Sequence, residues 1–117
     1  TNILFINQFP DFNSDKITGK INLVVLLGKK LSRWIFLLNI ILTILLSYLL
    51  KDLFLSKILN FNEIVFSLII SILAIYGLII SIGLFKNYNK RSLVYFNIQT
   101  IYYQIFFCFG IIISFYF

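Results

Sequence analysis

The sequence predicts an all-α membrane protein with three transmembrane helices. Of its 117 residues, 61% are hydrophobic and only 12% are charged, and the mean hydropathy is +1.00. A water-soluble domain carries about 25% charged residues, so this chain has too few charges to cover a globule in water. Three long apolar runs then set the number of spans, because about 20 apolar residues are needed to cross a bilayer.

The three runs are predicted to form one membrane domain over residues 1–117. The predicted helices cover residues 34–50, 64–85 and 93–117. The first run holds no charge, and its polar residues Asn39, Thr43 and Ser47 recur every four positions. That spacing puts them on one helix face, which we expect to turn toward neighbouring helices.

The second and third runs carry small and polar residues that predict helix contacts. Gly77 and Gly83 permit close approach of a neighbouring helix. Cys108 is expected to be a small buried filler. Polar residues in the first half of the third run are expected to face the bundle or lie near the interface: Asn97, Gln99 and Gln104.

The N-terminal part is more polar than the rest. Residues 1–9 are too short to span and are predicted to be the tail of a preceding helix. Pro10 removes a backbone donor, so a helix here must kink or restart. Residues 10–33 are predicted to form a loop whose apolar stretch, 21–27, lies at the interface or on the bundle. Because no Met occurs in the chain, we expect a C-terminal piece of a longer protein.

The positions of the basic residues predict the orientation in the membrane. Lys and Arg concentrate in residues 10–33 and 86–91, whereas the connector 51–63 is balanced. The positive-inside rule then places the N-terminal loop in the cytoplasm and the C-terminus outside, in a multi-pass protein of the cell inner membrane. The net charge of +6 is therefore attributed to topology rather than to nucleic-acid binding, since no basic stripe or aromatic-basic module is present.

The residue inventory excludes some chemistries within this chain. There is no His, which excludes a Ser-His-Asp triad and His-ligated metals. There is one Cys, so no internal disulfide can form.

Two aspartates near the N-terminus predict a divalent-cation site. Asp11 and Asp15 are four residues apart, which on a helix puts their Cβ atoms about 5–6 Å from each other. A cation between the carboxylates relieves their repulsion, and Mg²⁺ commonly combines one or two carboxylates with phosphate oxygens. Lys16 and Lys20 can meet such oxygens as point charges. The same pattern also occurs on solvated helices and in loops of the positive-inside kind.

The order of these parts resembles the end of a known enzyme family. Asn7-x-x-x-Asp11-x-x-x-Asp15-x-x-x-Gly19-Lys20, then the run 24–30 (VVLLGKK) and three spans, resemble the C-terminal portion of UbiA-family intramembrane prenyltransferases. In that family a D-x-x-x-D-x-x-x-G-K motif lies on a cytoplasmic loop after the sixth of nine helices. The resemblance covers the whole chain in layout and is most specific over residues 7–30.

The resemblance implies a function and a set of site residues. The local sequence is similar to quinone-type members, which attach a polyprenyl chain to 1,4-dihydroxy-2-naphthoate in menaquinone-like biosynthesis. Asp11 and Asp15 match the catalytic aspartates that hold Mg²⁺ and the diphosphate. The matched substrate-binding positions are Asn7, Lys16 and Lys20. The implied partners are a prenyl diphosphate, an aromatic acceptor and the lipid bilayer.

This sequence also departs from the family pattern. Asn22 stands where Thr or Ser is common. Gly19 matches the family glycine, for which we expect a turn with positive φ. The family's first motif, N-x-x-x-D-x-x-x-D, is absent from these residues, so we expect this chain to be inactive without the N-terminal remainder of the enzyme.

Two further hypotheses come from other classes of protein. A small non-catalytic membrane subunit of a larger complex would also explain a short chain of three spans. A transporter fragment would be expected to carry charge within its spans, and the three apolar runs carry none.

Overall fold

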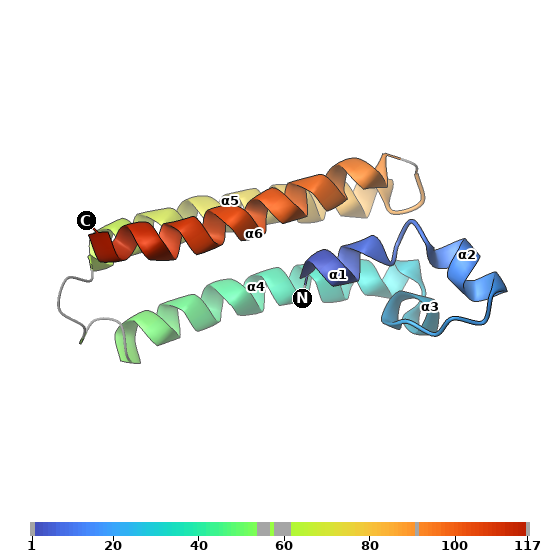
Figure 1. The fold of residues 1–117 in the computed structure, drawn as a ribbon, viewed down its shortest axis with the longest axis horizontal. Helices are drawn as coiled ribbons and strands as arrows, with labels where there is room; N and C mark the ends of the chain where they lie inside the picture. Colours follow the sequence, from blue (N-terminus) through green and yellow to red (C-terminus); the bar gives the residue numbers. More distant parts are fainter. Residues whose placement is uncertain (1, 54–56, 58–61, 91, 117) are drawn as a thin grey trace.

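The computed structural model describes residues 2–53, 57, 62–90 and 92–116 (Figure 1). Over these residues the chain is helical, without strands. The helices are α1 (Asn2–Asn7), α2 (Phe12–Ile17), α3 (Leu23–Leu27), α4 (Lys29–Leu53), α5 (Glu63–Asn87) and α6 (Leu93–Tyr116). The three long helices contain the predicted spans, and the three short ones make up the N-terminal polar part.

Helices α4, α5 and α6 are long and apolar enough to cross a membrane. Their most apolar stretches have mean hydropathies of 2.0, 2.6 and 1.6, in chain order. At about 1.5 Å per residue each is about 36 Å long, which exceeds the hydrocarbon core of about 30 Å. The predicted fold class, an all-α multi-pass membrane protein with three spanning helices, is confirmed.

α4 and α5 extend beyond the predicted spans at their polar ends, whereas α6 begins at Leu93 as predicted. α4 begins at Lys29 rather than at residue 34, directly after Gly28, whose positive φ of 78° interrupts the helical path. Lys29, Lys30 and Arg33 of the predicted loop thus lie at the start of α4. Parts of the predictions lie outside the described residues: 54–56 and 58–61 of the connector, Arg91 of the basic turn, and Phe117.

Helix α5 runs antiparallel to both α4 and α6 and packs against both of them (Figure 1). The three helices meet at Gly77 of α5. A Cβ at this glycine would lie 2.7 Å from Ile40 Cγ2 of α4 and 3.2 Å from Tyr103 Cε2 of α6. The predicted close approach at Gly77 is therefore confirmed, and the absence of a side chain there lets all three helices pack together.

The short helix α1 completes the core at one end of the bundle. It packs against both α4 and α6. Its buried side chains Phe5 and Ile6, together with Phe9 in the turn that follows, belong to the same core as Phe36 of α4. α1 ends at Asn7 and α2 begins at Phe12, so the predicted interruption at Pro10 is confirmed.

The N-terminal polar part and the turn between α5 and α6 lie at the same end of the bundle (Figure 1). Arg33 of α4 joins them, because its Nη1 donates a hydrogen bond of 3.2 Å to the Phe85 carbonyl of α5. The guanidinium also stacks on the Phe85 and Tyr88 rings, 4.8 and 4.6 Å from their centroids. At the opposite end, the backbone N–H of Asn62 donates to the Ser114 carbonyl of α6 at 2.8 Å.

The predicted polar face of α4 turns inward but does not link helices through its hydroxyls. Ser47 is buried and Asn39 and Thr43 are half-buried. The Thr43 and Ser47 hydroxyls instead donate to carbonyls four residues earlier in α4, at 2.8 Å each. Tyr48 makes the contact to α5, with its hydroxyl 3.1 Å from Ser71 Oγ.

Two predictions for α6 are wrong. Cys108 is exposed rather than a buried filler, and Gln104 is exposed in the middle of the helix, where its amide lies 3.9 Å from the Cys108 sulfur. The buried face of α6 follows Tyr103 and Gly110. Cys108 comes five residues after Tyr103 and is therefore turned about 140° away from that face. By contrast, Gln99 faces the bundle as expected and accepts a hydrogen bond from Tyr76 of α5.

Candidate functional site

The predicted aspartate motif runs through α2 and into the turn between α2 and α3. The first intrahelical bond of α2 runs from the Asp15 amide to the Asp11 carbonyl, at 2.8 Å. Thr18 is the C-cap of α2, and its hydroxyl donates to the Ser14 carbonyl at 2.9 Å. Gly19 then adopts a positive φ of 73°, as predicted, and lets the Lys20 amide donate back to the Asp15 carbonyl at 2.9 Å.

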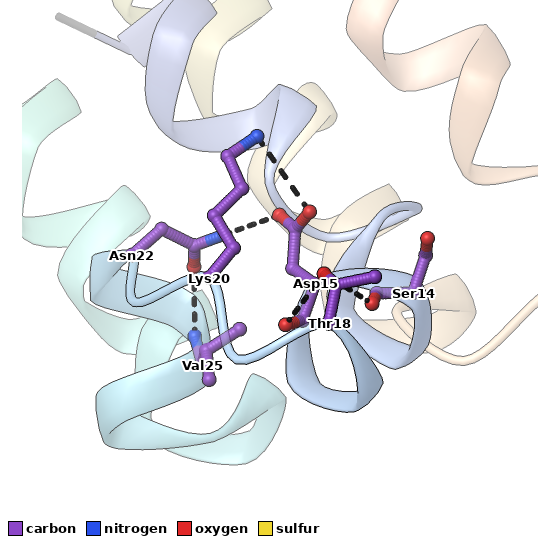
Figure 2. A network of polar contacts seen from close by, with 6 residues as sticks. All are labelled: Ser14, Asp15, Thr18, Lys20, Asn22 and Val25. Atoms are coloured by element: carbon purple, nitrogen blue, oxygen red, sulfur yellow. Dashed lines mark hydrogen bonds and ion pairs between the residues drawn. The ribbon is translucent and has the colours of Figure 1, made fainter.

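This turn brings Asp15 together with Lys20 and Asn22 (Figure 2). Asp15 Oδ2 accepts a hydrogen bond of 2.6 Å from the Asn22 amide, and Oδ1 lies 3.6 Å from the Lys20 ammonium. The Asp15 side chain is only 12% exposed, whereas that of Lys20 is 70% exposed. An ion pair with so exposed a partner is worth about 0–1 kcal/mol, so the Lys20 ammonium can exchange for another cation at little cost.

The side-chain oxygen of Asn22 caps the N-terminus of α3. Its Oδ1 accepts from the Val25 amide at 2.8 Å, and the residue has the extended backbone that is usual before a helix. Gln8 supports the same turn, since its Oε1 accepts from the Val24 amide at 3.3 Å. Val24 is fully buried in the core, and α3 packs against α4. The carboxylate of Asp15 is thereby connected to the rigid bundle.

Asp11 and Asn7 have different surroundings from Asp15. Both are exposed, and Asp11 stands at the start of α2 without capping it through its side chain. One turn of helix separates Asp11 from Asp15, but only Asp15 is drawn into the Asn22 and Lys20 contacts. The structure therefore divides the predicted aspartate pair into one solvent-facing and one anchored carboxylate.

Lys16 lies beside a ring rather than beside a carboxylate. Its ammonium is 5.9 Å from the centroid of Phe12, and the Lys29 ammonium approaches the same ring at 5.4 Å. Such contacts hold a cation weakly on an aromatic face. Two positive charges thus gather around the ring of Phe12, the residue that follows Asp11.

The residues present fit a shared cation site. Within the described ranges, no three His, Cys, Asp or Glu side chains gather closely enough to hold a metal ion by themselves. Mg²⁺ needs no such cluster, because it commonly combines one or two protein carboxylates with phosphate oxygens and water. Asp11 is open to solvent and Asp15 Oδ1 faces an exchangeable ammonium, so both carboxylates have oxygens that suit a mixed site of this kind.

Sequence reasoning did not identify the role of Asn22. A signal was present, since an Asn after a Gly-Lys turn and directly before an apolar run is typical of a helix N-cap. The N-cap accounts for the side-chain oxygen of Asn22. The bond from the side-chain nitrogen to Asp15 depends on the three-dimensional path of the turn, which the spacing of seven residues does not reveal.

No family model, no curated protein and no solved structure matches this chain.

Proposed function

We propose that this chain is the C-terminal part of a Mg²⁺-dependent polyprenyltransferase of the UbiA type. Its N-terminal turn would bind the diphosphate of a prenyl diphosphate at the membrane surface. The observation that carries the proposal is the cluster of an anchored carboxylate, an exchangeable lysine and a second, solvent-facing carboxylate at one end of three helices of spanning length. Such a cluster suits a substrate with a charged head and an apolar tail.

Each residue of the turn has a role in this proposal. Asp11 and Asp15 hold Mg²⁺, which when bound supplies Lewis-acid neutralisation of the departing diphosphate. Lys16 and Lys20 add positive charge where the leaving group gains negative charge. Asn7, exposed at the end of α1, contacts the substrate beside them.

The proposed reaction is transfer of a prenyl group to an aromatic ring. The C–O bond of the prenyl diphosphate breaks, and the diphosphate leaves with the electron pair. A carbon of an electron-rich ring, of the 1,4-dihydroxy-2-naphthoate kind, then forms a bond to the allylic carbon and loses a proton. The apolar bundle excludes water, which otherwise captures the allylic cation.

The proposed orientation places this turn in the cytoplasm and the C-terminus outside. Exposed lysines lie at the start of α4 (Lys30), at the end of α5 (Lys86) and in the turn that follows (Lys90). These segments lie at the end of the bundle that carries the site (Figure 1). Since cytoplasmic ends of membrane proteins carry an excess of Lys and Arg, this clustering supports a cytoplasmic site in the cell inner membrane.

The proposal is tested with the complete polypeptide in lipid nanodiscs. It predicts Mg²⁺-dependent transfer from a polyprenyl diphosphate to 1,4-dihydroxy-2-naphthoate, and a loss of at least about 100-fold in rate for Asp11→Ala, because a metal ligand is removed. Asp52→Ala is the matched control, since it removes an exposed carboxylate of α4 near the opposite end of the bundle.

Two results would reject the enzyme. One is transfer by Asp11→Ala at the rate of the unaltered protein. The other is absence of transfer in the unaltered protein together with recovery of this chain in a stable complex with other membrane proteins. The second result would favour the small non-catalytic subunit. A subunit of that kind needs no cation at the turn, because Lys20 already pairs with the Asp15 carboxylate.

A further inference from the structure

Asn22 makes two hydrogen bonds that join the proposed metal ligand to a helix packed on the bundle (Figure 2). Its amide nitrogen donates to Asp15 Oδ2 at 2.6 Å, and its amide oxygen accepts from the Val25 backbone at 2.8 Å. Both groups of the side chain are therefore used. The reverse orientation would point its oxygen at a carboxylate and its NH₂ at a backbone N–H, so the network determines the orientation of the amide.

The two oxygens of Asp15 consequently differ. Oδ2 is held by a short bond from a half-buried amide whose own position is fixed by the α3 cap. Among the described residues Oδ1 is paired only with the ammonium of Lys20, at 3.6 Å and on a side chain that is 70% exposed. A short hydrogen bond to a charged group is stronger than an exposed ion pair, so Oδ1 is the oxygen that a divalent cation can take.

We infer that Asn22 is a positioning residue that orients Asp15 so that Oδ1 is presented to the Mg²⁺–diphosphate complex. The inference rests on the proposed function and adds to it a residue outside the aspartate motif. Hydrogen bonds from neighbouring groups to a ligating carboxylate fix its direction and its basicity. The Lys20 ammonium, which lies 3.6 Å from Oδ1, moves to the diphosphate when the cation binds.

Two substitutions separate the two bonds of Asn22. Asn22→Ser keeps a good N-cap for α3, but its hydroxyl is too short to reach Asp15. Asn22→Ala removes both the cap and the bond to Asp15. Gln8→Ala is the matched control, because Gln8 accepts a hydrogen bond from the neighbouring Val24 backbone and makes none with Asp15 among the described residues.

The experiment measures Mg²⁺ affinity by calorimetry, with the complete polypeptide in nanodiscs and farnesyl thiodiphosphate as a slowly reacting probe. Hydrogen exchange of the α3 amides is measured on the same samples. We expect Asn22→Ser and Asn22→Ala to weaken Mg²⁺ binding equally, by about 10-fold or more, with Gln8→Ala unchanged. We expect faster α3 exchange in Asn22→Ala but not in Asn22→Ser.

Two results overturn the inference, and they differ. If the unaltered protein binds Mg²⁺ tightly and Asn22→Ser binds it equally well, Asn22 acts only as a helix cap, and the proposed function stands. If the unaltered protein does not bind Mg²⁺ with the probe, the proposed function fails and the inference falls with it. A failure of Asn22→Ala to fold leaves the decision to Asn22→Ser, which keeps the cap.

Discussion

At the scale of single residues, the site is organised by the environment of Asp15. A carboxylate that is nearly buried requires partners, because an unpaired charge away from water is costly. The Asn22 amide and the Lys20 ammonium supply them. Asp11 is open to water and needs no partner of this kind. The two carboxylates are therefore suited to different tasks, one anchored and the other free to adapt to a ligand.

Gly19 was predictable from the sequence, whereas the partner of Asp15 was not. A glycine between an apparent helix and a lysine is typical of a turn with positive φ, and the structure has φ +73° there. The Asn22 bond arises only after that turn has reversed the chain direction. Local chemistry therefore predicted the turn, but the contact across it depends on the path that the chain takes through space.

Gly19→Ala should loosen the turn without any steric clash. A Cβ at this position would have nothing within 4 Å, so the cost is the left-handed backbone conformation itself, about 1 kcal/mol for a residue with a side chain. We expect the α2 amides to exchange about five-fold faster in hydrogen exchange. The α2 amides of Gly19→Asn should exchange at a rate closer to that of the unaltered protein, because Asn tolerates this conformation. Equal protection in Gly19→Ala and the unaltered protein would contradict the assigned backbone.

At the scale of elements, the spans were predictable and their contacts were less so. Three apolar runs set the number of long helices because a helix satisfies its own backbone in hydrocarbon. The positions of Cys108 and Gln104 were not evident, because most side chains of α6 are apolar or aromatic and the sequence does not distinguish the bundle face from the lipid face. Gly77 was the informative exception, because close packing requires a small residue.

Gly77→Leu should separate the long helices. The nearest atom to an added Cβ is a methyl group of Ile40, which is fully buried and branched and therefore has little freedom to move. Overpacking a core costs about 1–3 kcal/mol of stability, and we expect a residue as large as Leu to cost an amount near the upper limit. Replacing Gly in a helix gains only about 1 kcal/mol in helix propensity, which does not offset that cost.

Denaturant titration in detergent micelles measures this change. The control is Ile75→Ala, which alters a side chain of the same helix that is 62% exposed. We expect a lower unfolding midpoint for Gly77→Leu and only a small change for the control. An unchanged midpoint in Gly77→Leu would show that the three helices do not meet at this position.

At the scale of the whole molecule, one end of the bundle concentrates the polar chemistry. The turn between α2 and α3, the start of α4 and the turn after α5 lie together there (Figure 1). Arg33 holds this end together by bonding to α5 and stacking on Phe85 and Tyr88. The outer faces of the long helices are apolar and exposed. A charged head at a membrane surface and an apolar tail within the bilayer match this division.

The central claim is that this end of the molecule binds a divalent cation and a lipid diphosphate together. The most direct measurement is a double titration of the complete polypeptide in nanodiscs with Mg²⁺ and farnesyl thiodiphosphate, each at several fixed concentrations of the other. Because a Mg²⁺ ion held by Asp11 and Asp15 would also bind the diphosphate oxygens, we predict that each ligand raises the affinity of the other by about ten-fold or more, equally in both directions. Affinities that are independent of each other would contradict the claim.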